Sequence, residues 1–271
     1  MGCFENGGRR MKADVAGSFR NVPHYAIRQS SACSVRQFMS LMSVLSRQRV
    51  RLSVLEVGPL TYSVFEEDLE PVQEVFSSLK KLVFYLSAIK DTPWRPKAQA
   101  SLFGSEGFCD VVGNGKAIKL LSIASQLTHL SISTEDAPFR KEANFKSFVA
   151  NYTWPQLKRL SIGNLVASEN DLIDFLSRHR LEELSIRSVT LQGSWITALP
   201  AMREAASPTL DQAIAYEWIT NETGESWYLG LHPAKSIVGR SDETSLGLHV
   251  AYYLSKAPNG YPCPLTLSNT S

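Results

Sequence analysis

The sequence has few cysteines, and none of them is spaced as in a metal site. Only four occur among the 271 residues, at Cys3, Cys33, Cys109 and Cys263. A zinc site needs clustered Cys or His ligands, and disulfide frameworks are typical of much shorter secreted chains. We therefore expect reduced thiols, no metal, and an intracellular protein that is cytoplasmic or nuclear.

Long apolar runs are also missing. No stretch reaches the roughly 18 uninterrupted apolar residues that a membrane-spanning helix needs. Residues 1–17 are too polar for a secretory signal. A membrane is therefore not an expected partner. One alternative is a membrane-associated scaffold acylated at Gly2 and Cys3, although Asn6 stands where the myristoylation pattern has Ser or Thr.

Motifs of the common enzyme classes are absent. The sequence contains no GxSxG, no HExxH, no EF-hand loop and no dinucleotide-binding glycine pattern. Gly115-Lys116 comes closest to a phosphate-binding loop, but Asp110 stands where that motif has Gly, and Ala117 where it has Ser or Thr. We expect no catalytic residues, no cofactor and no enzymatic activity. The alternative is an enzyme or enzyme regulator whose site is built from loops such as residues 91–116.

Charge is spread unevenly along the chain. The formal net charge is +2, yet residues 1–51 carry nine basic residues against two acidic ones. Residues 1–35 are predicted to form a basic, poorly ordered arm. No basic and aromatic stripe follows the rest of the chain, so nucleic acid is not an expected partner.

What the sequence does have is a repeated leucine pattern. The pattern Leu-x-x-Leu-x-aliphatic or aromatic occurs five times, at Leu52–Val57, Leu79–Phe84, Leu127–Ile132, Leu157–Ile162 and Leu181–Ile186. The steps between first leucines are 27, 48, 30 and 24 residues. Three of these steps are at or near the length of leucine-rich repeats, roughly 20–29 residues. The longest step is rich in Pro and Gly and fits an inserted loop.

Each copy predicts a strand preceded by a helix. Alternation along a strand sends the second Leu and the last apolar residue of a copy to one face, and the first Leu enters the same core from the preceding turn. The predicted strands are residues 52–58, 79–86, 127–133, 157–163 and 181–187, parallel and adjacent in one curved sheet. Helical patterns precede them at Gln37–Leu45, Leu69–Phe76, Ala117–Ala124, Phe145–Val149 and Asn170–Leu176. A last helix begins at Trp195 and ends near Pro200 or at Ala206. The fold class predicted is α/β, a leucine-rich-repeat solenoid.

Three segments carry a resemblance to a known family: Trp154–Ile162, Asn170–His179 and Leu181–Ile186. Through them, residues of about 35–206 resemble the leucine-rich-repeat region of fungal F-box proteins. In that family the F-box docks onto a Skp-type adaptor of a ubiquitin ligase, and the repeats hold the protein to be ubiquitinated. The resemblance therefore implies a protein-binding scaffold and, more specifically, a substrate receptor of a ubiquitin ligase.

This chain departs from the family in two ways. Its first 35 residues contain no Leu-Pro-x-Glu start of an F-box. The Asn that usually closes each repeat is replaced by Leu60, Glu135, Leu165 and Val189, so we expect irregular repeats. The predicted division is an arm of residues 1–35, a repeat domain of residues 36–206, and residues 207–271 as a C-terminal cap with an acidic, partly disordered tail. The aromatic residues expected to plug the open end of the core are Tyr216, Trp218, Trp227, Tyr228, Tyr252 and Tyr253.

The candidate binding surface follows from the same alternation. Side chains between the core positions should point out of the sheet on its concave side. These are Glu56, Lys81, Tyr85, His129, Arg159, Glu183 and Arg187. Mixed charge with an aromatic ring suits a protein ligand, since Arg and aromatic residues dominate interface hot spots. Ordinary solvated sheet surface is the alternative, and it is also the interpretation given to the column of Ser131, Ser161 and Ser185.

Overall fold

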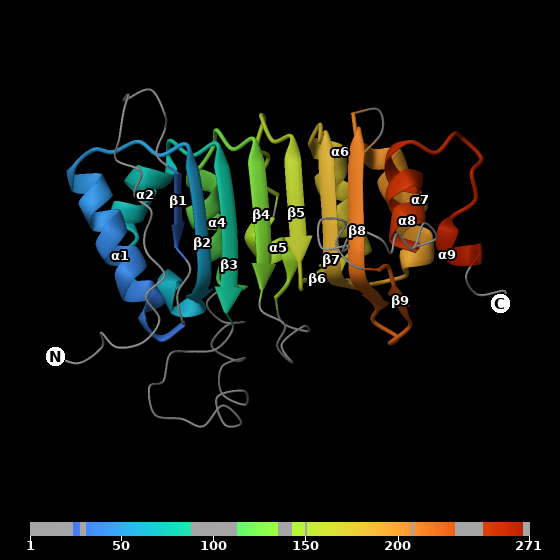
Figure 1. Ribbon diagram of the computed structural model, residues 1–271, viewed down its shortest axis with the longest axis horizontal. Helices are drawn as coiled ribbons and strands as arrows, with labels where there is room; N and C mark the ends of the chain where they lie inside the picture. The colour runs from blue at the N-terminus through green and yellow to red at the C-terminus, as the bar shows by residue number, and fades with distance from the viewer. Residues whose placement is uncertain are drawn as a thin grey trace, which may run out of the picture.

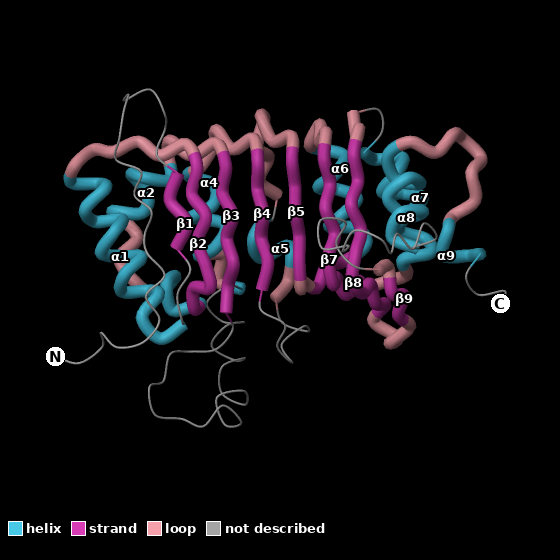
Figure 2. Tube along the Cα trace, in the orientation of Figure 1, coloured by secondary structure: helices cyan, strands magenta, loops and turns pink. Residues whose placement is uncertain are grey.

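One sheet runs through the whole described part of the chain. In the computed structural model, residues 24–27, 31–87, 113–134, 143–149, 151–206, 209–230 and 246–267 are described (Figures 1 and 2). The strands are β1 (His24–Ile27), β2 (Val54–Thr61), β3 (Lys81–Ser87), β4 (His129–Thr134), β5 (Arg159–Gly163), β6 (Val166–Ser168), β7 (Glu183–Gln192), β8 (Gln212–Asn221) and β9 (Ser226–Tyr228). Their order is β1-β2-β3-β4-β5-β7-β8-β9, and β6 pairs with β7. All pairs are parallel except β8 with β9.

Helices back this sheet. They are α1 (Ser31–Arg47), α2 (Glu70–Phe76), α4 (Lys116–Ile123), α5 (Phe145–Val149), α6 (Glu169–Arg178), α7 (Trp195–Ala206), α8 (Leu246–Ser255) and α9 (Pro264–Leu267), with a 3-10 helix η1 at Tyr62–Glu66. In the view of Figure 1 they lie behind the sheet or beyond its two ends. An α/β fold with a mostly parallel sheet backed by helices is therefore confirmed. None of the described helices is long and apolar enough to cross a membrane.

The five predicted strands are confirmed as parallel neighbours, and each begins two residues later than predicted. The first Leu of each copy, such as Leu157, is buried in the turn before the strand rather than within it. Register places the second leucines side by side, so that Leu130, Leu160 and Leu184 form one buried row. The apolar residue that ends each copy forms the next buried row. The helices cover both rows, and one continuous core results.

The sheet extends beyond the five copies on both sides. β1 pairs with β2, so the sheet begins within residues 1–35, where a poorly ordered arm was predicted. At the other end β8 pairs with β7 and carries a sixth, weaker copy of the motif, in which Ala213 and Ala215 replace the usual large residues. Its first residue, Leu210, is buried as in the other copies. Backbone hydrogen bonding, rather than leucine content, thus sets the length of the sheet.

Polar side chains close the strands at their carboxyl ends. Asn164, which has a φ of 54°, donates from Nδ2 to the carbonyl oxygen of Thr134 at 2.7 Å. The Thr134 hydroxyl donates back to the carbonyl oxygen of Asn164. Asn164 also donates its backbone N–H to the carbonyl oxygen of Arg187 at 2.9 Å. The chain therefore has an asparagine at the end of β5, one residue before Leu165, which occupies the usual position of the repeat asparagine. Its side chain hydrogen-bonds the end of β4.

Candidate functional site

The seven residues predicted for the binding surface lie on the sheet face opposite the helices. Lys81, His129, Arg159 and Glu183 are register neighbours on β3, β4, β5 and β7. We call this face the open face, because no described helix lies in front of it in Figure 1. Two further rows run parallel to the first. One comprises Glu56, Val83, Ser131, Ser161, Ser185 and Ile214, and the other comprises Tyr85, Ser133, Gly163, Arg187 and Tyr216.

A groove crosses the strands on the open face. Its floor includes Ser131, Ser161 and Ser185, which are shorter than the side chains of the neighbouring row. The row from Lys81 to Glu183 forms one wall, and β8 extends the groove with Gln212 and Ile214. Its empty volume is about 590 Å³, which includes space open to solvent. The groove exists because three serines fall at the same register position on successive strands.

Ion pairs hold the charged side chains of this surface. Lys81 Nζ lies 2.7 Å from Glu56 Oε1, and Arg159 Nη2 lies 3.1 Å from Glu183 Oε1. Both pairs are partly exposed, so each contributes no more than about 1 kcal/mol to stability. Side chains that are paired this weakly can exchange their partners when a ligand arrives.

His129 is hydrogen-bonded to its neighbour in the chain. Its Nδ1 lies 2.7 Å from Thr128 Oγ1, and that hydroxyl donates its own proton to the carbonyl oxygen of Lys80. The Lys80 carbonyl oxygen also accepts the backbone N–H groups of Thr128 and His129, so the Thr128 hydroxyl can equally donate to Nδ1. Burial lowers the pKa of His129, and Arg159 beside it lowers the pKa further.

Arg187 lies across a space left by a glycine. A Cβ atom on Gly163 would lie 3.0 Å from Arg187 Nε, so the glycine makes room for the guanidinium. Arg187 Nε is 3.9 Å from Glu217 Oε2. Next to it Tyr216 hydrogen-bonds the Ser185 side chain, and burial raises the pKa of the Tyr216 hydroxyl. Arg187 and Tyr216 are register partners on β7 and β8, in the row next to the serines.

Two aromatic rings remain exposed on β8 and β9. Trp218 and Tyr228 are register partners with ring centroids 5.0 Å apart, and they are 45% and 47% exposed. The prediction that the C-terminal aromatic residues plug the core is wrong for these two rings, for Tyr252, which is 43% exposed, and for Tyr216, which lies on the open face. It holds for Trp227 and Tyr253, which are buried in the core. Alternation along β9 explains the difference, because Trp227 and Tyr228 point to opposite faces.

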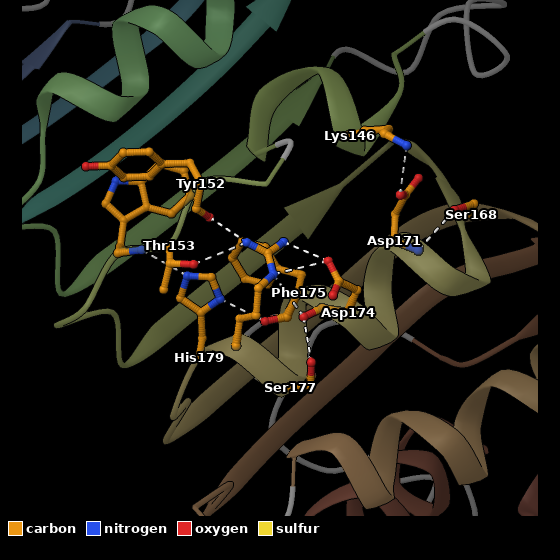
Figure 3. A network of polar contacts seen from close by, with 11 residues as sticks. Lys146, Tyr152, Thr153, Ser168, Asp171, Asp174, Phe175, Ser177 and His179 are labelled. Atoms are coloured by element: carbon orange, nitrogen blue, oxygen red, sulfur yellow. Dashed lines mark hydrogen bonds and ion pairs between the residues drawn. The ribbon is translucent and has the colours of Figure 1, made fainter.

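His179 has a structural role, since both of its ring nitrogens are bonded within the protein (Figure 3). Nε2 accepts the backbone N–H of Trp154 at 3.0 Å, and Nδ1 donates to the carbonyl oxygen of Phe175 at 2.7 Å. The ring also stacks on Phe175, with centroids 4.0 Å apart. Burial lowers the pKa of His179, which fits a neutral ring that accepts one hydrogen bond. It is therefore no candidate for a catalytic base, and it stands at the C-terminus of α6.

The alternative sites fall largely outside the described residues. The loop of residues 91–116 is described only from Gly113 onward, and Gly2 and Cys3 are not described. Within the described ranges, no group of three or more His, Cys, Asp or Glu side chains could hold a metal ion.

Comparison of the chain with protein-family models, with curated proteins and with solved structures found no match. What the protein does must therefore be inferred from its own surface.

The sequence missed the part of the groove that β8 supplies. Gln212 and Ile214 were not predicted, because Ala213 and Ala215 hide the repeat. A signal was present, since Leu210 follows Leu181 by 29 residues, which is a normal repeat length. From the sequence alone, the serine column is expected to be ordinary solvated sheet surface. Its position between two rows of larger side chains depends on register, which the sequence does not show directly.

Proposed function

We propose that this chain is a leucine-rich-repeat scaffold that binds a segment of another protein in the groove on its open face. The observation that carries the proposal is the groove itself, which has a serine floor and walls of mixed charge. The repeat interpretation is supported by helix and strand units that stack in the same register from β2 to β8. In repeat proteins, such a continuous sheet surface is the usual binding face.

The chemistry of the open face around the groove favours a protein ligand over the alternatives. Glu56, Glu183 and Glu217 lie among the basic side chains and would repel the phosphates of a nucleic acid. The groove is open to solvent on one side, whereas small-molecule sites enclose most of their ligand. Arg159, Arg187 and the exposed aromatic rings are residue types that dominate protein interfaces.

The resemblance to F-box proteins supports a more specific role. We propose that the bound protein is a client for ubiquitination and that a Skp-type adaptor joins the complex. Co-purification tests this directly. Recovery of an adaptor together with a client would support a ligase receptor, whereas a client without an adaptor would favour a stand-alone binding scaffold.

A double substitution tests the binding face. Tyr85→Ala with Arg159→Ala removes an aromatic ring and a cation from the open face, and we expect at least a tenfold loss of partner recovery, or about 1.4 kcal/mol. The matched control is Val44→Ala with Lys119→Ala, which removes an apolar and a basic side chain from exposed positions of α1 and α4. Both proteins should melt as the wild type does. Unchanged recovery with the first pair and reduced recovery with the control would place binding on the helical side.

A further inference from the structure

We propose that the groove recognises a carboxylate, the side chain of an Asp or Glu in an extended partner segment, at the junction of β4 and β5. This inference rests on the proposed function and narrows the chemistry of the partner. It concerns the part of the groove bordered by Lys81, His129, Arg159, Ser131 and Ser161.

Register brings the donors of this junction together. His129 on β4 is the partner of Arg159 on β5, and Ser131 is the partner of Ser161 two residues further along the same strands. Lys81 stands beside His129 on β3. Neighbouring strands lie about 4.8 Å apart and residues two apart project to the same face. Four polar side chains from two strands therefore surround one spot on the groove floor.

The two serine hydroxyls at this spot are uncommitted. Within the described ranges no protein group hydrogen-bonds the side chain of Ser131 or Ser161, although both residues are half-buried. The third serine of the floor differs, because Ser185 is bonded to Tyr216. Half-buried hydroxyls without a protein partner are ready donors to an anionic oxygen. The β4–β5 junction thus differs chemically from the rest of the floor.

The two cations keep donors for a second acceptor. Arg159 contacts Glu183 through Nη2, and a guanidinium has five N–H donors in a planar fork that suits a carboxylate. Lys81 contacts Glu56, and an ammonium has three donors. Each cation can therefore bind a partner carboxylate while keeping or exchanging its internal partner.

A carboxylate suits this site better than a phosphate does. Glu56 and Glu183 already balance the charges of Lys81 and Arg159. A phosphoserine would bring a charge of about −1.5 to −2 against these two glutamates, whereas a carboxylate brings only −1. The site therefore offers several donors but little excess positive charge, which favours a monoanion.

His129 makes the binding sensitive to pH. The ring of His129 borders the proposed site, so a bound carboxylate favours its protonated form, in which both ring nitrogens are donors. The charged groups that face His129 are Lys81 on β3, Arg159 on β5, Glu183 on β7 and Glu182 just before it. A bound carboxylate adds one more negative charge to this set and therefore raises the pKa of His129. Affinity should therefore rise as the pH falls below about 6.5, toward the lowered pKa of the unliganded ring.

A peptide display experiment tests the inference. A library of random peptides of about 12 residues is selected on the full chain, and enriched peptides are synthesised in three versions that differ at one position: Glu, Gln or phosphoserine. We expect an Asp or Glu at a fixed position of the enriched peptides. The Glu version should bind roughly tenfold more tightly than the Gln version, as expected for a charge-assisted hydrogen bond. It should also bind more tightly than the phosphoserine version, and more tightly at about pH 5.5 than at about pH 7.5.

Variants of the protein locate the effect. Arg159→Gln, and separately Ser131→Ala with Ser161→Ala, should abolish the preference for Glu over Gln, and His129→Gln should abolish the pH dependence. Lys158→Gln is the matched control, because Lys158 precedes Arg159, pairs with Glu182 at 2.6 Å as Arg159 pairs with Glu183, and does not line the groove. It should keep the preference for Glu.

The outcomes separate this inference from the proposed function. Peptides that bind the open face without an acidic consensus, or that prefer phosphoserine, would overturn the carboxylate site and leave peptide binding intact. A preference for Glu that Lys158→Gln removes and Arg159→Gln keeps would also overturn it. If no peptide is enriched, the carboxylate site and the peptide-binding groove are both wrong.

Discussion

Two histidines show how position decides what a residue can do. His129 lies on the open face between Lys81 and Arg159, with one ring nitrogen bonded to a neighbouring threonine. His179 is buried, and its two nitrogens are bonded to the backbone of Trp154 and Phe175. Only the first can respond to a ligand. The second holds the end of α6 against the turn that precedes β5.

The buried histidine predicts how stability depends on pH. The pKa of His179 is lower in the folded chain than its ordinary value of 6.5, so the unfolded chain binds more protons near and below that pH. Its stabilising contribution is therefore complete above about pH 6.5 and declines as the pH falls toward the lowered pKa. His179→Gln should cost about 1–3 kcal/mol at neutral pH through the lost buried hydrogen bonds. It should also flatten the dependence of stability on pH between about 6.5 and 5.

Denaturant unfolding at a series of pH values checks this prediction. His249→Gln is the matched control, since His249 is exposed on α8, and its unfolding curves should follow those of the wild type. His129→Gln should remove part of the same pH dependence, because the pKa of His129 is also lowered. If the free energy of unfolding of the wild type increases as the pH falls from about 6.5 to 5, the account of the buried ring is wrong.

At the scale of single elements, the leucine pattern predicted the strands from β2 to β7 that carry its copies, and helical periodicity predicted the helices before them. It could not predict β1, because β1 has no matching leucine copy, or β8, because Ala213 and Ala215 replace the large residues of the motif. The outward side chains were predictable from alternation alone. The groove was not, because it depends on the register that aligns Ser131, Ser161 and Ser185.

The start of α6 offers a test of a helix cap. The Ser168 hydroxyl accepts the backbone N–H of Asp171 at 3.0 Å. Ser168→Ala should lower the free energy of unfolding by about 1 kcal/mol, because one N–H of the first turn loses its acceptor. Ser177→Ala near the end of the same helix should change stability much less, since that exposed hydroxyl donates only to the carbonyl oxygen of Asp174. Equal losses in a thermal melt of the two variants would show that Ser168 is no cap.

At the scale of the whole molecule, the core and the groove are two consequences of one repetition. Strands with a common register place Leu130, Leu160 and Leu184 in a single buried row and the serines in a single outward row. No strand alone could bury the first row or form the groove from the second. Stability and binding therefore depend on opposite faces of the same strands.

Core substitutions should separate these two faces. Leu160→Ala or Leu184→Ala should cost about 2–5 kcal/mol, because each removes a buried side chain from the stacked row. Ser161 lies between Leu160 and Ile162 on β5 but faces the groove. Ser161→Ala should therefore change the free energy of unfolding by no more than about 0.5 kcal/mol. Denaturant unfolding measures all three. A negligible loss for both leucine variants would mean that this row does not support the fold.

The central claim is that a partner protein occupies the open face, and site-directed photo-crosslinking tests it most directly. A benzoylphenylalanine placed at Tyr85 lies in the outermost row of the open face, and one placed at Val44 lies at an exposed position of α1. On irradiation of the complex, we predict a covalent adduct with the partner from position 85 and none from position 44. An adduct that forms from position 44 and not from position 85 would contradict the claim and place the partner on the helical side.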